Sequence, residues 1–276
     1  MKLSPAVLTI VALSALYSNA AQAQTSAAPR TWFQLSETFA TWKMQTRSDV
    51  GLFQGAALAP IQVEDTLGAP RRSPITGLQF GRLIGERWRV EVEHTRSRRH
   101  GQATLGSDLD VGGVTYLRGT VLQSDLSLTT LGVNGGAALL KNEATELGLL
   151  FGGFWLRTNL RSDGFSGTGV VGSPTTFPNR NEGGGTTALP MLGGYGSWAA
   201  GPDWQLQSRA EFGVGGDRHA RLVANARWQP QRNLAVNLGY RYIKTRVDVN
   251  YSFIGTTHLQ VNYQAHGPAL AAELAF

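Results

Sequence analysis

Two pairs of residues in the sequence have the side chains needed for acid–base chemistry. One residue separates Asp108 from Asp110, and one residue separates Asp217 from His219. A carboxylate can orient and polarise a histidine, which can then activate a water molecule for attack on a bond. The four residues form a candidate catalytic site only if the fold brings together two segments that are far apart in the sequence.

A second pattern suggests nucleotide binding, but its surroundings argue against it. Residues 167–172 read G-x-G-x-x-G, which binds a dinucleotide only between a strand and a helix. Pro174 and Pro178 follow closely and prevent a helix from starting there. The chain also has no cysteine, which excludes disulfides and thiolate metal sites. We therefore expect a loop at this position, no cofactor and no metal.

The elements that carry these residues are predicted to be strands, because apolar and polar side chains alternate along the chain. Trp88, Val90 and Val92 share one face of such a segment, and Arg89, Glu91 and Glu93 share the other. The predicted strands span residues 32–45, 74–83, 87–98, 117–139, 143–160, 187–199, 203–215, 219–230, 233–247 and 258–276. Many are longer than the about 5–6 residues of an ordinary strand and match the about 9–11 residues of a tilted transmembrane strand.

The connections between the predicted strands alternate between short and long. Short turns are expected at 84–87, 141–142, 200–203 and 230–233, and longer segments near 47–73, 98–115 and 161–186. Aromatic residues stand near the ends of the apolar faces, as in the girdles of membrane barrels. They are Trp88, Trp204, Trp228, Tyr240 and Tyr242. This asymmetry is typical of a barrel with short turns on one side of a membrane and loops on the other.

The first 23 residues have the three parts of a secretory signal peptide. A short basic start at Lys2 precedes an apolar run over residues 6–17, and Ala21 and Ala23 provide the small residues of a cleavage site. We therefore expect residues 1–23 to be removed and residues 24–276 to form one domain. Export makes nucleic acid an unlikely partner despite the basic pI of about 9.9.

The end of the chain resembles bacterial outer-membrane β-barrel proteins. Leu270, Leu274 and the terminal Phe276 alternate along the last predicted strand, as in the C-terminal signature of those proteins. The resemblance implies a closed, antiparallel, all-β transmembrane barrel in a Gram-negative outer membrane, inserted by the barrel-insertion machinery. We expect about ten strands, with eight or twelve as alternatives, because the number of strands in such single-chain bacterial barrels is even. The sequence assigns neither a subfamily nor an oligomeric state.

In a barrel of this kind the polar face of each strand points into the lumen. Arg89, Glu91, Glu93, Arg209, Glu211, Arg221, Arg227 and Arg241 are the predicted lumen charges. A ten-stranded barrel is nearly as narrow as the eight-stranded barrels whose interiors side chains fill. We therefore interpret these charges mainly as an ion-pair network that packs the lumen, and keep a narrow charge-lined pore as the alternative.

Arginine is far more frequent than lysine, with 21 residues against four. The outer leaflet of the membrane that the resemblance implies is lipopolysaccharide, and arginine binds phosphate through two parallel hydrogen bonds. Arg96, Arg98, Arg99 and His100 lie at or just after the outer end of a predicted membrane strand and are our candidate lipid-phosphate patch. A solvated loop without a fixed partner is the alternative interpretation.

Two classes of barrel enzyme offer a catalytic alternative. The order and spacing of Asp108, Asp110, Asp217 and His219 are similar to the acidic and Asp-x-His pairs of the omptin proteases, although the flanking residues differ. His94 and Ser97 lie close in sequence, and lipid A hydrolases also use His and Ser. We favour a non-enzymatic, porin-like or structural barrel that contacts lipid and lipopolysaccharide, with an adhesin or ligand-binding barrel as a further alternative.

Overall fold

The computed structural model describes residues 31–48, 61–111, 114–168, 175–215, 218–252 and 256–276. The expected signal peptide lies outside these residues. Within the described part of the chain, no helix has the length and apolar character needed to cross a membrane.

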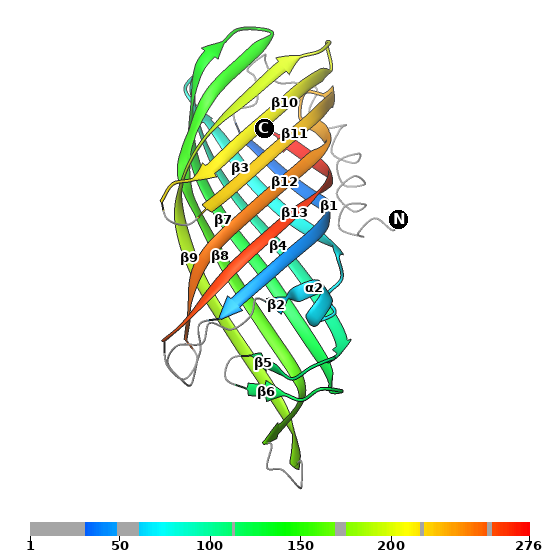
Figure 1. Cartoon of the computed structure of the whole chain (residues 1–276). Coiled ribbons are helices and arrows are strands. Elements are labelled where there is room, and N and C mark those ends of the chain that lie inside the picture. Colours follow the sequence, from blue (N-terminus) through cyan, green and yellow to red (C-terminus); the bar gives the residue numbers. More distant parts are fainter. Residues whose placement is uncertain (1–30, 49–60, 112–113, 169–174, 216–217, 253–255) are drawn as a thin grey trace.

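Ten long strands form one closed antiparallel barrel (Figure 1), which confirms the predicted fold class and strand number. They are β1 (Thr31–Ser48), β3 (Arg72–Ile84), β4 (Trp88–Thr104), β7 (Val121–Lys141), β8 (Thr145–Thr168), β9 (Thr175–Ala199), β10 (Trp204–Gly213), β11 (Arg218–Gln231), β12 (Leu234–Ser252) and β13 (Thr256–Ala275). Each strand pairs with its neighbours in this order, and β13 pairs with β1 to close the barrel. Backbone hydrogen bonds of 3.1 and 2.8 Å join Thr31 to Phe276 across this seam.

The two ends of the barrel differ. Short turns connect β3 to β4, β7 to β8, β9 to β10 and β11 to β12 at the end where Thr31 and Phe276 also lie, which we call the turn end. The opposite loop end carries the remaining short elements (Figure 1, lower part). These are β2 (Ile61–Gln62), α2 (Val63–Thr66), β5 (Leu109–Val111) and β6 (Val114–Tyr116). This is the predicted arrangement of turns and loops.

Several strands are longer than predicted at the loop end. β8 and β9 pair without interruption from Thr145 opposite Trp198 to Thr168 opposite Thr175. The predicted loop over 161–186 is therefore wrong over most of its length, and β4 likewise continues to Thr104. The outer parts of β8 and β9 are rich in Gly, Ser, Asn and Arg, so no apolar alternation marks them as strands. Ladder hydrogen bonds of the backbone, which do not depend on side-chain type, hold them together.

An apolar belt surrounds the barrel near the turn end. Large apolar side chains point outward and are exposed, for example Phe80 at 47%, Phe151 at 47% and Leu238 at 62%. A water-soluble monomer rarely exposes so large a continuous apolar surface, whereas the outer face of a membrane barrel requires one. Trp204 and Trp228 stand opposite each other at the edge of the belt, with ring centroids 6.3 Å apart. The belt is therefore the lipid-facing part of the barrel.

The apolar and polar faces exchange places where the strands leave the belt. On β12, Leu238 and Tyr240 point outward, whereas farther on Ile243 and Val247 are buried inside and Lys244 is exposed. The same inversion occurs on β1 and β7. Beyond the belt the barrel is thus organised like a water-soluble protein, with an apolar interior and a polar exterior.

The interior consequently has two layers. Inside the belt, charged side chains of β4, β8, β10, β11, β12 and β13 fill the lumen, and we call them the charged layer. Toward the loop end, an apolar core fills the barrel with buried side chains that include Trp42, Leu128, Leu156, Ile243 and Tyr263. Strands β8, β12 and β13 contribute inward-facing side chains to both layers.

The apolar core predicts a stability difference between two leucines of β8. Leu156 is fully buried inside the barrel, whereas Leu149 points to lipid and is 52% exposed. We expect Leu156→Ala to lower the free energy of unfolding in detergent by about 2–5 kcal/mol, because a cavity replaces packed atoms. Leu149→Ala should have a much smaller effect, since detergent fills the space. Equal losses in guanidinium titrations of tryptophan fluorescence would contradict the interior core.

Candidate functional site

The charged layer contains all eight predicted lumen charges, and each forms at least one ion pair. Glu146 of β8 and Glu273 of β13 complete the set. The pairs are Arg89 with Glu91 and Glu146, Arg209 with Glu91 and Glu211, Arg221 with Glu93 and Glu211, Arg241 with Glu93, and Arg227 with Glu273. We did not predict Glu146 as a lumen charge. It is the second residue of β8, directly after a turn, where too few residues precede it to establish the alternation.

Some of these ion pairs cross the lumen, and others run along its wall. Arg209 of β10 pairs with Glu91 of β4, which lies on another side of the barrel, and donates a 2.8 Å hydrogen bond to Glu211. Arg221 of β11 reaches Glu93 of β4 and lies 3.4 Å from Glu211. Because carboxylates and guanidinium groups are shared in this way, the network links β4, β8, β10, β11 and β12 and occupies the centre of the barrel.

Buried ion pairs of this kind require every partner, since isolated charges are very costly in a low-dielectric interior. Glu91, Glu93 and Glu211 are each at most 5% exposed. A polar cavity of about 300 Å³ remains on the turn-end side of the layer, and Gln34, Gln79 and Gln207 are among the residues that line it. The charged layer is the inner boundary of this cavity.

Residues 61–69, which precede β3, pack against the interior at the loop end of the barrel. Val63 and Leu67 are 1% exposed and pack into the apolar core. The Glu64 carboxylate accepts a 3.0 Å hydrogen bond from the backbone N–H of Met44 and pairs with Arg99. We call residues 61–69 the mouth segment.

Gly101 and Arg99 both hold the mouth segment against the barrel interior. A Cβ at Gly101 would lie 2.4 Å from the carbonyl oxygen of Leu67, so this backbone approach needs a residue without a side chain. Arg99 also donates to the carbonyl oxygen of Pro70 at 3.1 Å and lies 5.2 Å from the Trp42 ring centroid. Burial lowers the pKa of Arg99, and its pairing with Glu64 opposes that shift.

Arg99 therefore does not belong to the predicted lipid-phosphate patch. It is 1% exposed and faces the interior, whereas Arg96, Arg98 and His100 on the same strand are exposed. The reason is the period of two along β4, which sends consecutive residues to opposite faces. His100 is hydrogen-bonded to Asp125 of β7.

The exposed arginines continue across β7 onto β8. Arg96 of β4 pairs in register with Thr129 of β7, which pairs in turn with Arg157 of β8. All three side chains point outward, just beyond the apolar belt. Arg96, Arg98 and Arg157 therefore form a basic surface at the outer edge of the belt, which we call the rim patch.

The structure does not assemble the candidate acid–base site from its described side chains. Asp108 accepts a 2.7 Å hydrogen bond from the backbone N–H of Arg118 within its own loop. His219 is 4% exposed, hydrogen-bonded to Thr245 at 2.9 Å and stacked on Phe154 inside the barrel. The side chain of Asp110 and the whole of Asp217 lie outside the described residues.

The residues named for a lipid A hydrolase are also separated. His94 points outward into the belt, whereas Ser97 is buried and donates a 3.0 Å hydrogen bond to the carbonyl oxygen of Pro74. An odd separation along a strand places two side chains on opposite faces. His94 and Ser97 therefore cannot act on the same substrate atom.

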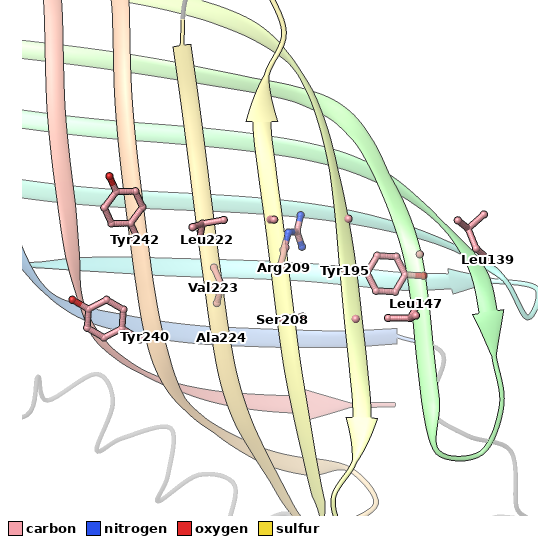
Figure 2. Close-up of a pocket in the computed structure, with 14 residues that line it drawn as sticks. Leu139, Leu147, Tyr195, Ser208, Arg209, Leu222, Val223, Ala224, Tyr240 and Tyr242 are labelled. Atoms are coloured by element: carbon pink, nitrogen blue, oxygen red, sulfur yellow. The ribbon is translucent and has the colours of Figure 1, made fainter.

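Part of the lipid-facing wall is lined by small residues (Figure 2). Gly196 of β9, Ser208 of β10 and Ala224 of β11 lie side by side in register. They form a shallow groove of about 660 Å³ with larger side chains at its sides, Leu147 on β8 and Tyr240 on β12. The groove is on the outer surface of the barrel, at the level of the apolar belt.

No protein-family model matches the chain, and no curated protein matches its sequence. Among solved structures, the outer membrane protease OmpT from Escherichia coli is similar, with a TM-score of 0.60 and 11% identity over 92% of this chain and 99% of OmpT. Neisserial surface protein A has a TM-score of 0.35 and 9% identity over 91% of this chain and 100% of its own. Ail, the attachment invasion locus protein of Yersinia pestis, has a TM-score of 0.30 and 10% identity over 87% and 99%.

The likeness to OmpT concerns the fold, since 11% identity carries no shared chemistry with it. Together with the closed ten-stranded sheet, the lipid-facing belt and the polar membrane interior, it defines the class of the protein. The chain is a β-barrel of the Gram-negative outer-membrane type.

The shared carboxylate of Glu93 yields a test of the charged layer. Glu93→Gln would leave Arg221 without its closest carboxylate and Arg241 without its ion pair. We expect the free energy of unfolding to fall by about 3–5 kcal/mol, because a buried charge loses its partner. As the control, Asp65→Asn removes an exposed ion pair with Arg71 and should leave unfolding essentially unchanged. Equal behaviour of the two variants in denaturant titrations would refute a structural charged layer.

Proposed function

We propose that the protein is a non-enzymatic structural barrel of the outer membrane whose lumen does not conduct ions. The filled interior is the observation that supports this function. The mouth segment, the apolar core and the charged layer follow one another along the barrel axis. Conduction needs a continuous hydrated path, and each of these three layers interrupts one.

The proposed location is the outer membrane, reached after cleavage of the predicted signal peptide. The apolar belt supports a membrane position, and the last strand supports insertion by the barrel-insertion machinery. Phe276 is 72% exposed at the turn end and, with Leu274, is available for recognition. The signal peptide itself is supported only by the sequence pattern of residues 1–23.

Lipopolysaccharide is the proposed partner of the rim patch. Arg96, Arg98 and Arg157 lie at the height where phosphate groups of an outer leaflet would meet the barrel wall. Guanidinium groups bind phosphate in a bidentate manner, and Thr129 between two of them adds a hydroxyl group. Such contacts would fix the height of the barrel in the membrane.

We do not propose peptidase or lipid A hydrolase activity. Buried His219 offers no access to a peptide, and His94 and Ser97 point to opposite faces. The surface most suited to an external ligand is the outer part of β8 and β9, which extends farthest beyond the belt (Figure 1).

Single-channel recording tests the closed lumen. The mature protein, refolded and inserted in a planar bilayer, should show no reproducible conductance steps. Arg209→Gln should be equally silent, because the apolar core and the mouth segment still close the barrel. Reproducible steps in the unchanged protein whose ion selectivity shifts in Arg209→Gln would refute the proposal and make the charged layer the selectivity filter of a pore.

Lipopolysaccharide titration tests the rim patch. We expect lipopolysaccharide to raise the thermal unfolding midpoint of the barrel in detergent, and the triple variant Arg96→Ala, Arg98→Ala, Arg157→Ala to lose most of this shift. The matched control removes three exposed arginines at the turn end, Arg82, Arg87 and Arg232. It should keep the shift, since its charge change is the same but lies at the other end. Equal losses in both variants would indicate general charge attraction and contradict a defined patch.

A further inference from the structure

A small internal cavity lies where the charged layer meets the apolar core. Its volume is about 30 Å³, room for about two water-sized spheres. Trp42 and Ile243 line it from the apolar side, and His219, Arg221 and Arg241 line it from the polar side. The cavity thus lies inside the barrel and is bordered by two guanidinium groups.

Arg241 has less pairing than its burial requires. It is 5% exposed, and its ion pair is a single 3.4 Å contact between Nη2 and Oε1 of Glu93. That carboxylate also pairs with Arg221, so one negative charge serves two positive ones on this side of the layer. Glu211 adds a second carboxylate, but it is shared between Arg221 and Arg209. Nε and Nη1 of Arg241 have no hydrogen-bond partner among the described residues.

The other polar groups around the cavity can also donate hydrogen bonds. His219 is 4% exposed, its Nδ1 lies 2.9 Å from the Thr245 hydroxyl oxygen, and its Nε2 has no partner within the described part of the chain. When Nδ1 accepts from Thr245, Nε2 carries the hydrogen. Thr95 and Thr130 are joined by a 2.6 Å contact between their hydroxyl oxygens, which uses one hydroxyl hydrogen and leaves the other.

The described lining of this cavity contains no carboxylate, and arginine has no acceptor atom. Its polar side is therefore rich in donors, and the carboxylates that pair with its two guanidinium groups lie outside the lining. A buried donor without an acceptor is costly, and a buried charge with a weak partner is more so. The missing complement is an acceptor that also carries negative charge and fits a volume near 30 Å³.

We propose that the cavity binds one monatomic halide anion, chloride under ordinary conditions, held by Arg241, Arg221 and His219. A polyatomic anion such as sulfate or phosphate is too large for it. A water molecule would accept hydrogen bonds but would bring no negative charge next to the two guanidinium groups. The bound anion completes the charged layer and links it to the apolar core, so it stabilises the folded barrel.

The first experiment locates the anion directly. The full-length mature barrel is refolded with sodium bromide in place of sodium chloride and crystallised in detergent. An anomalous bromide peak within hydrogen-bond distance of Arg241 and His219 is the expected result. Density without anomalous signal would identify water in the cavity and overturn the proposal.

The second experiment tests whether anion binding stabilises the folded barrel. Thermal unfolding midpoints are measured at constant ionic strength while chloride or bromide replaces sulfate. A halide that binds only the folded state shifts the midpoint upward, and the shift saturates once the site is filled. Sulfate also stabilises proteins, by exclusion from their surface, but without such saturation. A bromide peak without a saturable shift would mean an adventitious ion only and would equally refute the proposal.

Two variants and one control connect the effect to the cavity. Arg241→Gln removes the under-paired guanidinium, and His219→Phe keeps an aromatic ring next to Phe154 but removes the Nε2 donor. Both should lose the saturable halide shift. Arg227→Gln is the matched control, because Arg227 pairs with Glu273 at 2.8 Å in the charged layer but does not line the cavity. It should keep the halide shift whatever its own stability, and its loss there would contradict the assignment.

Discussion

Each strand of this barrel passes from hydrocarbon into water, and in each solvent only one of its two faces can be apolar. In the belt the apolar face must point outward, because lipid solvates it, and the inward face is left to polar side chains. Beyond the belt the requirement reverses. On β12 the change falls between Tyr242, which points outward, and Ile243, which is buried inside. The charged layer inside the membrane and the apolar core beyond it are both consequences of this reversal.

The polar interior of the belt has a cost that the ion-pair geometry reduces. Charges in a low-dielectric interior must be paired, and the lumen is narrow enough for Arg209 to meet Glu91 across it. An apolar lumen would avoid this cost, but strands with two apolar faces would aggregate before insertion. Alternation keeps the mean hydropathy of the chain at −0.15. The network is thus a consequence of building a membrane wall from strands that must first remain soluble.

Much of the fold was predictable because alternation, short turns and the terminal Phe276 are local signals. The lumen charges were predictable for the same reason. When the apolar residues of a strand face lipid, the residues that alternate with them must face the lumen. Arg99 was assigned wrongly because the strand was predicted to end at residue 98, so the alternation along it was not extended to Arg99. Its partner Glu64 belongs to a mouth segment that alternation does not describe. The outer parts of β8 and β9 were missed since their stability comes from backbone pairing.

The unequal heights of the wall determine where external chemistry can occur. β10 ends at Gly213, close to the belt, whereas β8 and β9 continue to Thr168 and begin at Thr175 far beyond it (Figure 1). On the low side a residue near a strand start, such as His219, lies among core side chains rather than above a groove. The acid–base site predicted from residue spacing is therefore not formed by the described side chains. Spacing along the sequence does not show how far each strand extends beyond the membrane. The surface that our proposal assigns to an external ligand is therefore the tall side of the barrel, where Arg157 and Arg180 are exposed.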